Sequence, residues 1–401
     1  MRYEFKKLFS SVQMLICFAL LIAFLAFFVV QSYRSRDLTQ ENYTKLINEF
    51  SEKYTDENDL MEAIASKRFD ARSKINSEGE KNAFKIKGEY SENLMSDFFL
   101  LENAESYANY IYKEIPKHRK NIIKDSLYEI EETSENSLKT KYQTAVKKYN
   151  MKINTPFVNT GNINSSTLFF DFTIWDYAMM AFIIMLTVRM FILDRESGTY
   201  KVVYSSYYGK GKLFANQLSV CLVTAVMIVI LHMVCQLVCG KIFYGVNNLS
   251  LPIQSYEYFE FCPFNITLGE YFLIKTLGKI LLAVSVVSIT AMITCLSRKN
   301  ILSIVLSIVI VAGTMLFNTR FYLSANGNSG SLIKNQKDFT AIRTFLPACL
   351  LKPDEYFKSL DYVIIFNVAV PRFCCVCIIA VLISIVCVII SYKSFSMVRK
   401  G

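Results

Sequence analysis

Few residues in this chain have the types and spacing that enzyme chemistry requires. The two histidines, His118 and His232, belong to no zinc-binding H-E-x-x-H pair. Intramembrane aspartyl chemistry needs two facing carboxylates, and the long apolar stretches contain a single acidic residue, Asp176. The run Tyr-Gly-Lys-Gly-Lys at 208–212 lacks the upstream glycine of a P-loop, and Leu213 stands where the magnesium-binding hydroxyl belongs. The sequence therefore predicts no catalytic residue and no ATPase activity in this chain.

The cysteines give no metal-binding or disulfide framework. None of the 11 cysteines falls in the charged block at 34–171, where a disulfide would stabilise an external domain. The dense group at Cys374, Cys375 and Cys377 has no histidine near it, so we expect no metal site. A disulfide stays open for the cysteines near predicted outer segments, which are Cys239, Cys262 and Cys349.

Polar side chains at helical spacing inside apolar stretches are the remaining candidates for function. Such residues are expensive in lipid and usually face a helix bundle or a cavity. They could line a translocation path, or they could pack helices together through hydrogen bonds. For His232 alone, the sequence favours a packing role. The candidates for the path are Gln217, Thr224, His232, Ser303, Ser307 and Thr314.

Six apolar stretches must carry these residues. A bilayer core needs about 20 apolar residues per helix. The mean hydropathy is +0.30, and the charged residues, 19% of the chain, are concentrated between the stretches. The sequence therefore predicts an all-α polytopic membrane protein with six transmembrane helices. The stretches cover residues 12–30, 172–193, 218–239, 272–296, 301–317 and 373–392.

The stretches divide the chain into three parts. Residues 1–33 form an N-terminal tail and a retained first span, since no small-residue cleavage site follows it. Residues 34–171 form a predicted extracellular helical domain, and residues 172–401 hold spans two to six with a cytoplasmic loop at 194–216. The extracellular part is a helical hairpin above the membrane, or a substrate-capturing or gating domain. Its clearest helical stripe is Leu94, Phe98, Leu101, Ala104, Ala108, Ile111 and Ile115.

Basic residues near the stretch ends set the orientation. Lys and Arg in short loops are retained on the cytoplasmic side. They cluster at 2–7, 195–212, 298–299 and 393–400, all on one side of a six-span chain. We therefore expect a plasma-membrane protein with both termini in the cytoplasm. The net charge of +10 follows from this topology and implies no nucleic-acid partner.

Aromatic residues are predicted to mark the outer membrane surface. Trp175 and Tyr177 suit the outer aromatic belt. Residues 256–261 form an aromatic strip at the same interface, and residues 352–357 form a short interfacial helix before the last span.

The loop after the second predicted span has a distinctive order of residues. An acid-x-Gly-Thr start is followed by a short amphipathic run, a pair of serines and a basic re-entry into the membrane. This order resembles the coupling loop of ABC-2 type exporter permeases. The overall plan, with six spans and an external domain after the first, is similar too.

The resemblance implies a site and partners. Glu196, Gly198 and Thr199 stand at the family's acid-Gly-Thr positions, and Ser205 and Ser206 at its small-residue pair. The implied role is a short helix that docks in a groove of a separate ATP-binding subunit. That subunit would hold ATP and magnesium, and this chain would need no cofactor of its own. The other implied partners are a second permease subunit, identical or paired, and membrane lipids. An ordinary basic loop at the lipid surface is the alternative.

Two classes of function stay open. The first is the permease of an ATP-driven exporter for an unidentified peptide, drug, lipid-like molecule or ion. The second is a membrane sensor or interaction protein whose external domain binds a ligand without transport. The loop at 194–216 and the lack of a recognisable cytoplasmic signalling domain favour the first.

Overall fold

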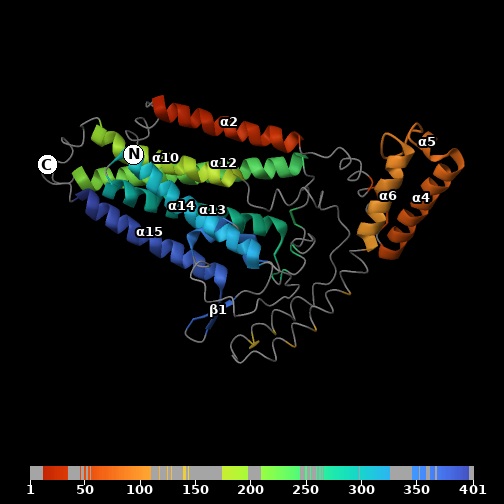
Figure 1. Ribbon diagram of the computed structural model, residues 1–401. Coiled ribbons are helices and arrows are strands. Elements are labelled where there is room, and N and C mark those ends of the chain that lie inside the picture. Colours follow the sequence, from red (N-terminus) through yellow and green to blue (C-terminus); the bar gives the residue numbers. More distant parts are fainter. Residues whose placement is uncertain are drawn as a thin grey trace.

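Figure 1 shows the computed structural model of the protein. The part of the chain that the structure describes is almost entirely helical. It comprises residues 12–34, 56–109, 174–196, 209–243, 266–297, 299–325, 346–351, 353–357, 362–365 and 368–396, with isolated positions at 46–54, 117–143 and 249–264.

Among the described residues, four helices are long and apolar enough to cross a membrane. These helices are α10 (Ile174–Glu196), α12 (Gly209–Phe243), α13 (Leu268–Ser297) and α15 (Arg372–Ser396). The chain therefore has the helices of a multi-pass membrane protein, as the hydropathy predicted. The 35 residues of α12 extend over about 50 Å at 1.5 Å per residue, which is more than a bilayer core requires.

Two further apolar helices flank the bundle. They are α2 (Val12–Arg34) and α14 (Asn300–Ala325). Within the residues whose side chains the structure describes, their apolar portions are Phe18–Gln31 and Asn300–Val311. Helix α2 packs against α10 and α12, whereas α14 packs against α10 and α13.

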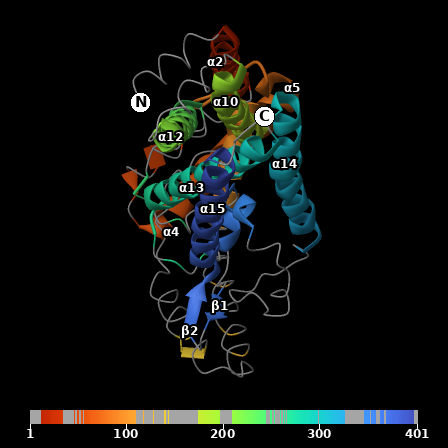
Figure 2. The ribbon, with the colours of Figure 1, turned by 90° about the vertical axis from the view of Figure 1, so that its left-hand side faces the viewer.

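Helix α13 is the centre of the bundle. It contacts α10, α12, α14 and α15, and Figure 2 shows it between α12 on one flank and α14 on the other. Its first turn is fixed by a capping box. The Thr267 N–H donates to Glu270 Oε2 at 2.7 Å, and the Glu270 N–H donates to Thr267 Oγ1 at 3.2 Å. The reciprocal bonds satisfy two backbone donors that the helix itself cannot pair.

The connection from α13 to α14 is a tight reversal. Ser297 closes α13 and Asn300 opens α14. The Ser303 hydroxyl lies 2.5 Å from the Ser297 hydroxyl and donates to the Lys299 carbonyl at 2.6 Å. These bonds fix the two helices against each other at one end.

The segment before α15 contains two short strands that the sequence did not predict. Strands β1 (Tyr362–Ile365) and β2 (Val368–Pro371) form an antiparallel hairpin in which Tyr362 pairs with Pro371. The hairpin leaves the predicted all-α class intact, because the described part of the chain is almost entirely helical. The β-branched residues of both short runs favour extended backbone over helix.

The predicted interfacial helix is also different in the structure. Two 3₁₀ helices, η6 (Pro347–Leu351) and η7 (Pro353–Tyr356), precede the hairpin. All five residues of η6 are buried, and η6 packs against α13, α14 and α15. Phe357 contacts the rings of Phe264, Tyr271 and Phe373. The segment is therefore packed into the bundle through its apolar side chains, as two 3₁₀ helices and not as the single short helix that the sequence predicted.

Aromatic residues that were predicted to lie at the outer membrane surface also make contacts inside the protein. Trp175 contacts the rings of Phe24, Phe27 and Phe28 on α2 at centroid distances of 5.3–5.6 Å. Phe259, from the predicted aromatic strip, is fully buried against Tyr271 of α13. These rings tie helices and loops together inside the protein.

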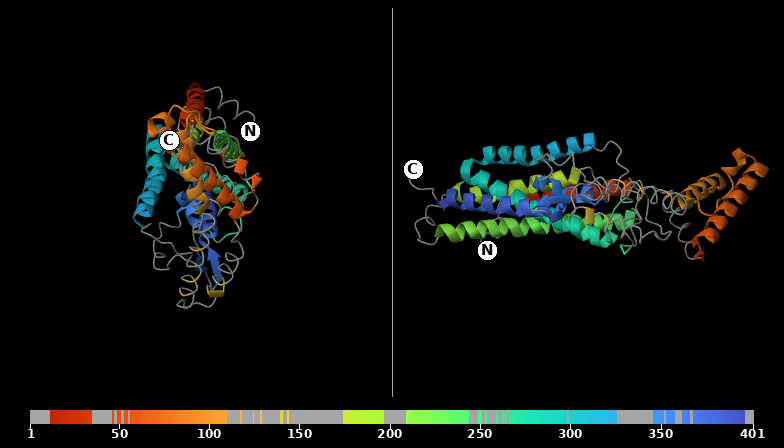
Figure 3. Two further views of the ribbon diagram at one scale, coloured as in Figure 1. Left: turned by 90° about the vertical axis from the view of Figure 1, so that its right-hand side faces the viewer. Right: turned by 90° about the horizontal axis from the view of Figure 1, so that it is seen from below.

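A separate helical unit precedes the bundle in sequence. It comprises α4 (Glu57–Glu78), α5 (Glu80–Ala83) and α6 (Leu94–Asn109), and it lies apart from the bundle in Figures 1 and 3. The predicted stripe on α6 is confirmed from Leu94 to Ala108, whereas Ile111 and Ile115 lie outside the described residues. The α4 stripe that packs against α6 was not predicted and consists of Leu60, Ile64, Ala71 and Ile75.

The caps of α4 define this unit's turns. The Asp56 side chain accepts hydrogen bonds from the backbone N–H groups of Asn58 and Asp59, as expected of an N-cap. Gly79 ends α4 with a φ of +82°, a conformation that residues with a Cβ rarely adopt.

The predicted cytoplasmic loop is shorter than expected. Helix α10 continues to Glu196 and α12 begins at Gly209, so the predicted loop 194–216 reduces to residues 197–208. Gly209 and Gly211 lie in the first turn of α12. Gly198, Thr199, Ser205 and Ser206 lie outside the described residues.

Candidate functional site

Three polar side chains from three helices meet inside the bundle. Asp176 of α10, His232 of α12 and Lys279 of α13 are all buried. The Lys279 ammonium donates to Asp176 Oδ1 at 2.5 Å, and His232 Nε2 lies 3.3 Å from the same oxygen. We call these three residues the ion cluster. Its members Asp176 and Lys279 are 103 residues apart in the sequence.

The depth of the ion cluster follows from helix lengths. On the side where α10 ends and α12 begins, the reference ends are Glu196, Gly209 and Ser297. At 1.5 Å per residue, Asp176, His232 and Lys279 lie about 27–35 Å along their helices from these ends. A bilayer core is about 30 Å thick. With the reference ends placed at one edge of the hydrocarbon layer, the ion cluster lies near the opposite edge.

Burial makes the pairing of these charges essential. Moving an isolated carboxylate or ammonium out of water costs several kcal/mol, in order of magnitude, even after relaxation. The Asp176 and Lys279 side chains are both 0% exposed, so each charge depends on the other for compensation. With a single carboxylate, the ion cluster has no partner acid for aspartyl chemistry. It can hold three helices together.

Other buried ionisable groups lie along the same face of α13 and beside it. Lys275 is one turn before Lys279, and Tyr271 is one turn before Lys275; both are buried. Asp354 of η7 and Arg372 at the start of α15 are also buried, and η7 packs against both α13 and α15. Intramembrane ionisable residues are rare and commonly functional. This end of α13 is therefore the most unusual region of the described bundle.

Sequence reasoning found part of this site and missed the rest. It singled out His232 and noted Asp176, but it passed over Lys275 and Lys279. A signal was available, since two lysines one turn apart interrupt an otherwise apolar span. Such residues require a partner at the same depth, and Asp176 is the acidic residue that the spans provide.

The hydroxyl groups of the other candidates for the translocation path mostly donate hydrogen bonds to nearby backbone carbonyls. The Thr224 hydroxyl donates to the Val220 carbonyl at 2.8 Å, and the Thr314 hydroxyl donates to the Val311 carbonyl at 2.8 Å. Ser303 bonds at the α13–α14 reversal, as described above. Such bonds satisfy hydroxyls inside lipid and fit a packing role.

Gln217 and Ser307 complete the set. Gln217 is buried, and its Nε2 donates to the Met190 carbonyl of α10 at 3.4 Å. Ser307 is buried on α14. Helices α12 and α14, which carry these candidates, lie on opposite flanks of α13 in Figure 2. The structure thus brings His232 to the ion cluster and leaves the other five candidates distributed along two helices.

The sequence left a disulfide open for three cysteines near predicted outer segments. Cys239, Cys262 and Cys349 are buried, and no disulfide joins any two of them in the structure. Across the described residues, no group of three or more metal-ligating side chains comes together.

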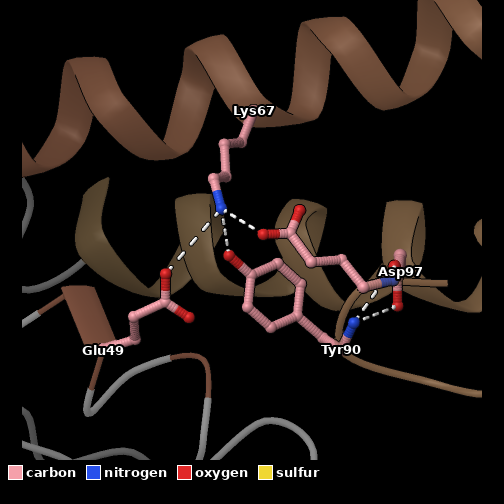
Figure 4. A network of polar contacts seen from close by, with 5 residues as sticks. Glu49, Lys67, Tyr90 and Asp97 are labelled. Atoms are coloured by element: carbon pink, nitrogen blue, oxygen red, sulfur yellow. Dashed lines mark hydrogen bonds and ion pairs between the residues drawn. The ribbon is translucent and has the colours of Figure 1, made fainter.

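A second polar network holds the helical unit α4–α6 together (Figure 4). The Lys67 ammonium donates to Glu89 Oε1 at 2.8 Å and to the Tyr90 hydroxyl, and Glu49 lies 3.9 Å away. Burial alone would lower the pKa of Lys67, but the hydrogen bonds to Glu89 and Tyr90 raise it well above its usual range. The hydrogen bond from Lys67 lowers the pKa of Glu89. The Lys67–Glu89 pair therefore stays ionised around neutral pH.

Asp97 fixes the turn that carries Glu89 and Tyr90. Its buried carboxylate accepts hydrogen bonds from the Glu89 and Tyr90 N–H groups and from the Ser91 hydroxyl at 2.6 Å. A Cβ on Gly88 would lie 2.6 Å from Asp97 Oδ2, so only glycine fits there without moving the carboxylate. The network is a structural clamp on one turn.

Comparison of the chain with protein-family models, with curated proteins and with solved structures found no match.

Proposed function

We propose that this chain is the membrane-spanning permease subunit of an ABC exporter. A separate ATP-binding subunit would hydrolyse ATP, and the permease would move an unidentified substrate out of the cell. The observation that carries the proposal is the short link between α10 and α12. Its 12 residues, 197–208, together with Glu196 at the end of α10, contain the whole acid-x-Gly-Thr and serine-pair pattern.

The two helices beside that link support docking. Helix α10 ends and α12 begins at the same end of the bundle (Figure 1), so both ends of the link are attached to helices of the bundle. A partner bound at the link would act on these two helices directly.

The topology completes the proposal. Helices α2 and α14 would add two spans to the four described above, giving six. Both termini and the link 197–208 would face the cytoplasm of a plasma-membrane protein, and the unit α4–α6 would be extracellular. The clusters of Lys and Arg support this orientation.

The proposed partners would supply the parts of an exporter that this sequence does not contain. It has no P-loop in its sequence, so ATP and magnesium would be held by the separate subunit. A second permease subunit, identical or paired, would complete the membrane part.

Loop variants test the proposal. Glu196 closes α10, and a positive charge at a helix C-terminus interacts favourably with the helix dipole. Glu196→Lys therefore should not destabilise α10, although it reverses the charge offered to a partner. Gly198→Pro removes a backbone donor and fixes φ in the link. We expect both variants to reach the membrane at normal levels and to lose co-purification of the ATP-binding subunit.

Lys85→Arg, at an exposed position of the α4–α6 unit, is the matched control and should bind the ATP-binding subunit like the wild type. Full association and full stimulation of hydrolysis in both loop variants would remove the docking role.

A sensor is the second candidate. The α4–α6 unit has its own apolar core and its own polar clamp, as a ligand-binding domain would. A sensor would bind its ligand through this unit and would function without any ATP-binding partner. In that case the intact chain would show no transport, and deletion of residues 56–109 would abolish its response to the ligand.

A further inference from the structure

A cavity of about 210 Å³ lies between α2, α10 and α12, next to the ion cluster. Its wall on α10 includes the small side chains of Ala178 and Ala181, which leave the space open. Its wall on α2 includes Leu20 and Phe24. Every side chain that lines the cavity is apolar except His232.

The shape of the cavity follows the helices. Along α10 the lining runs from Trp175 to Met185, and along α2 from Leu20 to Phe28. These distances are about 15 Å and about 12 Å at 1.5 Å per residue. One leaflet of a bilayer core is about 15 Å thick. The cavity is therefore as long as the hydrocarbon part of one leaflet.

The polar end of the cavity is also defined. Phe28 contacts Trp175 at one end, where the His232 ring lies 6.3 Å from Phe28, and Phe18 contacts Phe182 toward the other. His232 is 5% exposed and is held by Asp176 of the ion cluster. Since the ion cluster lies near the edge of the hydrocarbon layer, the apolar part of the cavity extends from His232 toward the bilayer centre.

The cavity is not sealed from its surroundings. The Leu20 and Phe24 side chains line it, yet they are 54% and 46% exposed. A dry apolar cavity of about 150 Å³ is large enough to bind benzene. The present cavity therefore has room for a segment of a hydrocarbon chain, which could enter from the membrane past α2.

The geometry points to a binding site for an amphiphile with an acyl chain. The chain fills the apolar cavity between α2, α10 and α12, and the polar head lies beside His232. The ligand comes from the surrounding bilayer, because the exposed side chains of α2 border that side. This site does not depend on the exporter role and would exist equally in a sensor.

Photolabelling of the full chain in lipid nanodiscs tests the site. The probe is a fatty acid with a diazirine at the middle of its chain. We expect adducts to concentrate on the α2 and α10 side chains that line the cavity, and unlabelled fatty acid to remove them. Ile385 and Ile389 of α15, exposed outside the cavity, report background labelling by the bilayer.

Two filling variants provide independent tests. Ala178→Leu and Ala181→Leu should each lower specific labelling about tenfold, because added methyl groups exclude an apolar ligand from a small site. Ala215→Leu, at an exposed position of α12 away from the cavity, is the matched control and should label like the wild type. Labelling spread evenly over α2, α10 and α15, or unchanged in both filling variants, would overturn the site.

The polar end has its own test. The wild type should label more strongly with the fatty acid than with an alkyl diazirine that lacks a head, by about threefold to tenfold, as one hydrogen bond allows. His232→Phe keeps an apolar wall and removes the imidazole, so this preference should disappear. A preference that survives His232→Phe would contradict the assignment of His232 to the head.

Discussion

At the scale of single residues, the Asp176–Lys279 pair decides how three helices meet. Each side chain is fully buried, so neither charge has water to compensate it. Replacing a whole buried pair by apolar residues is often harmless, whereas removing one partner typically costs about 3–5 kcal/mol. The pair therefore specifies the packing of α10 on α13 more than it adds net stability.

This asymmetry gives a prediction for the ion cluster. Asp176→Asn and Lys279→Met should each destabilise the full chain by about 3–5 kcal/mol, because each removes the nearest counter-charge of a fully buried group. The double variant should recover most of that loss. Unfolding of the purified chain in detergent measures all three. A double variant no more stable than the weaker single variant would show that the two charges are not coupled.

A second prediction concerns the Asp97 clamp in the α4–α6 unit. Asp97→Ala leaves the Glu89 and Tyr90 N–H groups without their acceptor, whereas the Ser91 hydroxyl still has the Asn93 carbonyl at 2.9 Å. We expect a loss of about 2–4 kcal/mol in local stability, since unsatisfied buried groups cost about 1–3 kcal/mol each and some will reach water. Faster hydrogen–deuterium exchange of residues 84–93 in the full chain measures the loss.

Asp70→Ala is the control for the clamp. Asp70 is exposed on α4, so exchange at 84–93 should not change. Equal exchange in Asp97→Ala and Asp70→Ala would show that the turn is held by other contacts.

At the scale of elements, the sequence was reliable where apolar length or periodicity controls the structure. The spans α10, α12, α13 and α15 follow from hydropathy, and the α6 stripe follows from a period of 3.6 residues. These features depend on local composition alone. That is why they could be predicted.

The sequence did not predict the features that depend on contacts between distant parts of the chain. The burial of η6 depends on apolar side chains that meet α13, α14 and α15, which no local pattern reports. Helix α12 begins at Gly209, inside the predicted loop 194–216, since glycine at a helix start costs little. At the site, His232 was found as a polar residue in a span. Its partners were missed because pairing between distant helices is not visible in one span at a time.

The orientation of the elements gives a prediction of topology. In a background without native cysteines, Asn82→Cys in the α4–α6 unit should react with an impermeant maleimide in intact cells. Ser205→Cys in the link should react only after permeabilisation. The reason is that Lys and Arg near the link retain it in the cytoplasm. Labelling of Ser205→Cys from outside would reverse or refute the topology.

At the scale of the whole molecule, the described bundle presents large apolar surfaces. Helices α12, α14 and α15 each expose several large apolar side chains. A soluble protein rarely leaves such surfaces uncovered, whereas lipid covers them in a membrane. These surfaces also leave room for a second membrane subunit beside the first.

Assembly with an ATP-binding subunit tests the exporter account most directly. The chain alone, and the chain co-expressed with a P-loop ATPase encoded beside its gene, would be purified and reconstituted, and their mass and ATP hydrolysis measured. We predict no hydrolysis by the chain alone, because its sequence contains no P-loop. With the ATPase, we predict a complex holding two membrane subunits, in which hydrolysis changes on reconstitution. A stable monomer that neither binds the ATPase nor alters its hydrolysis would contradict the exporter account.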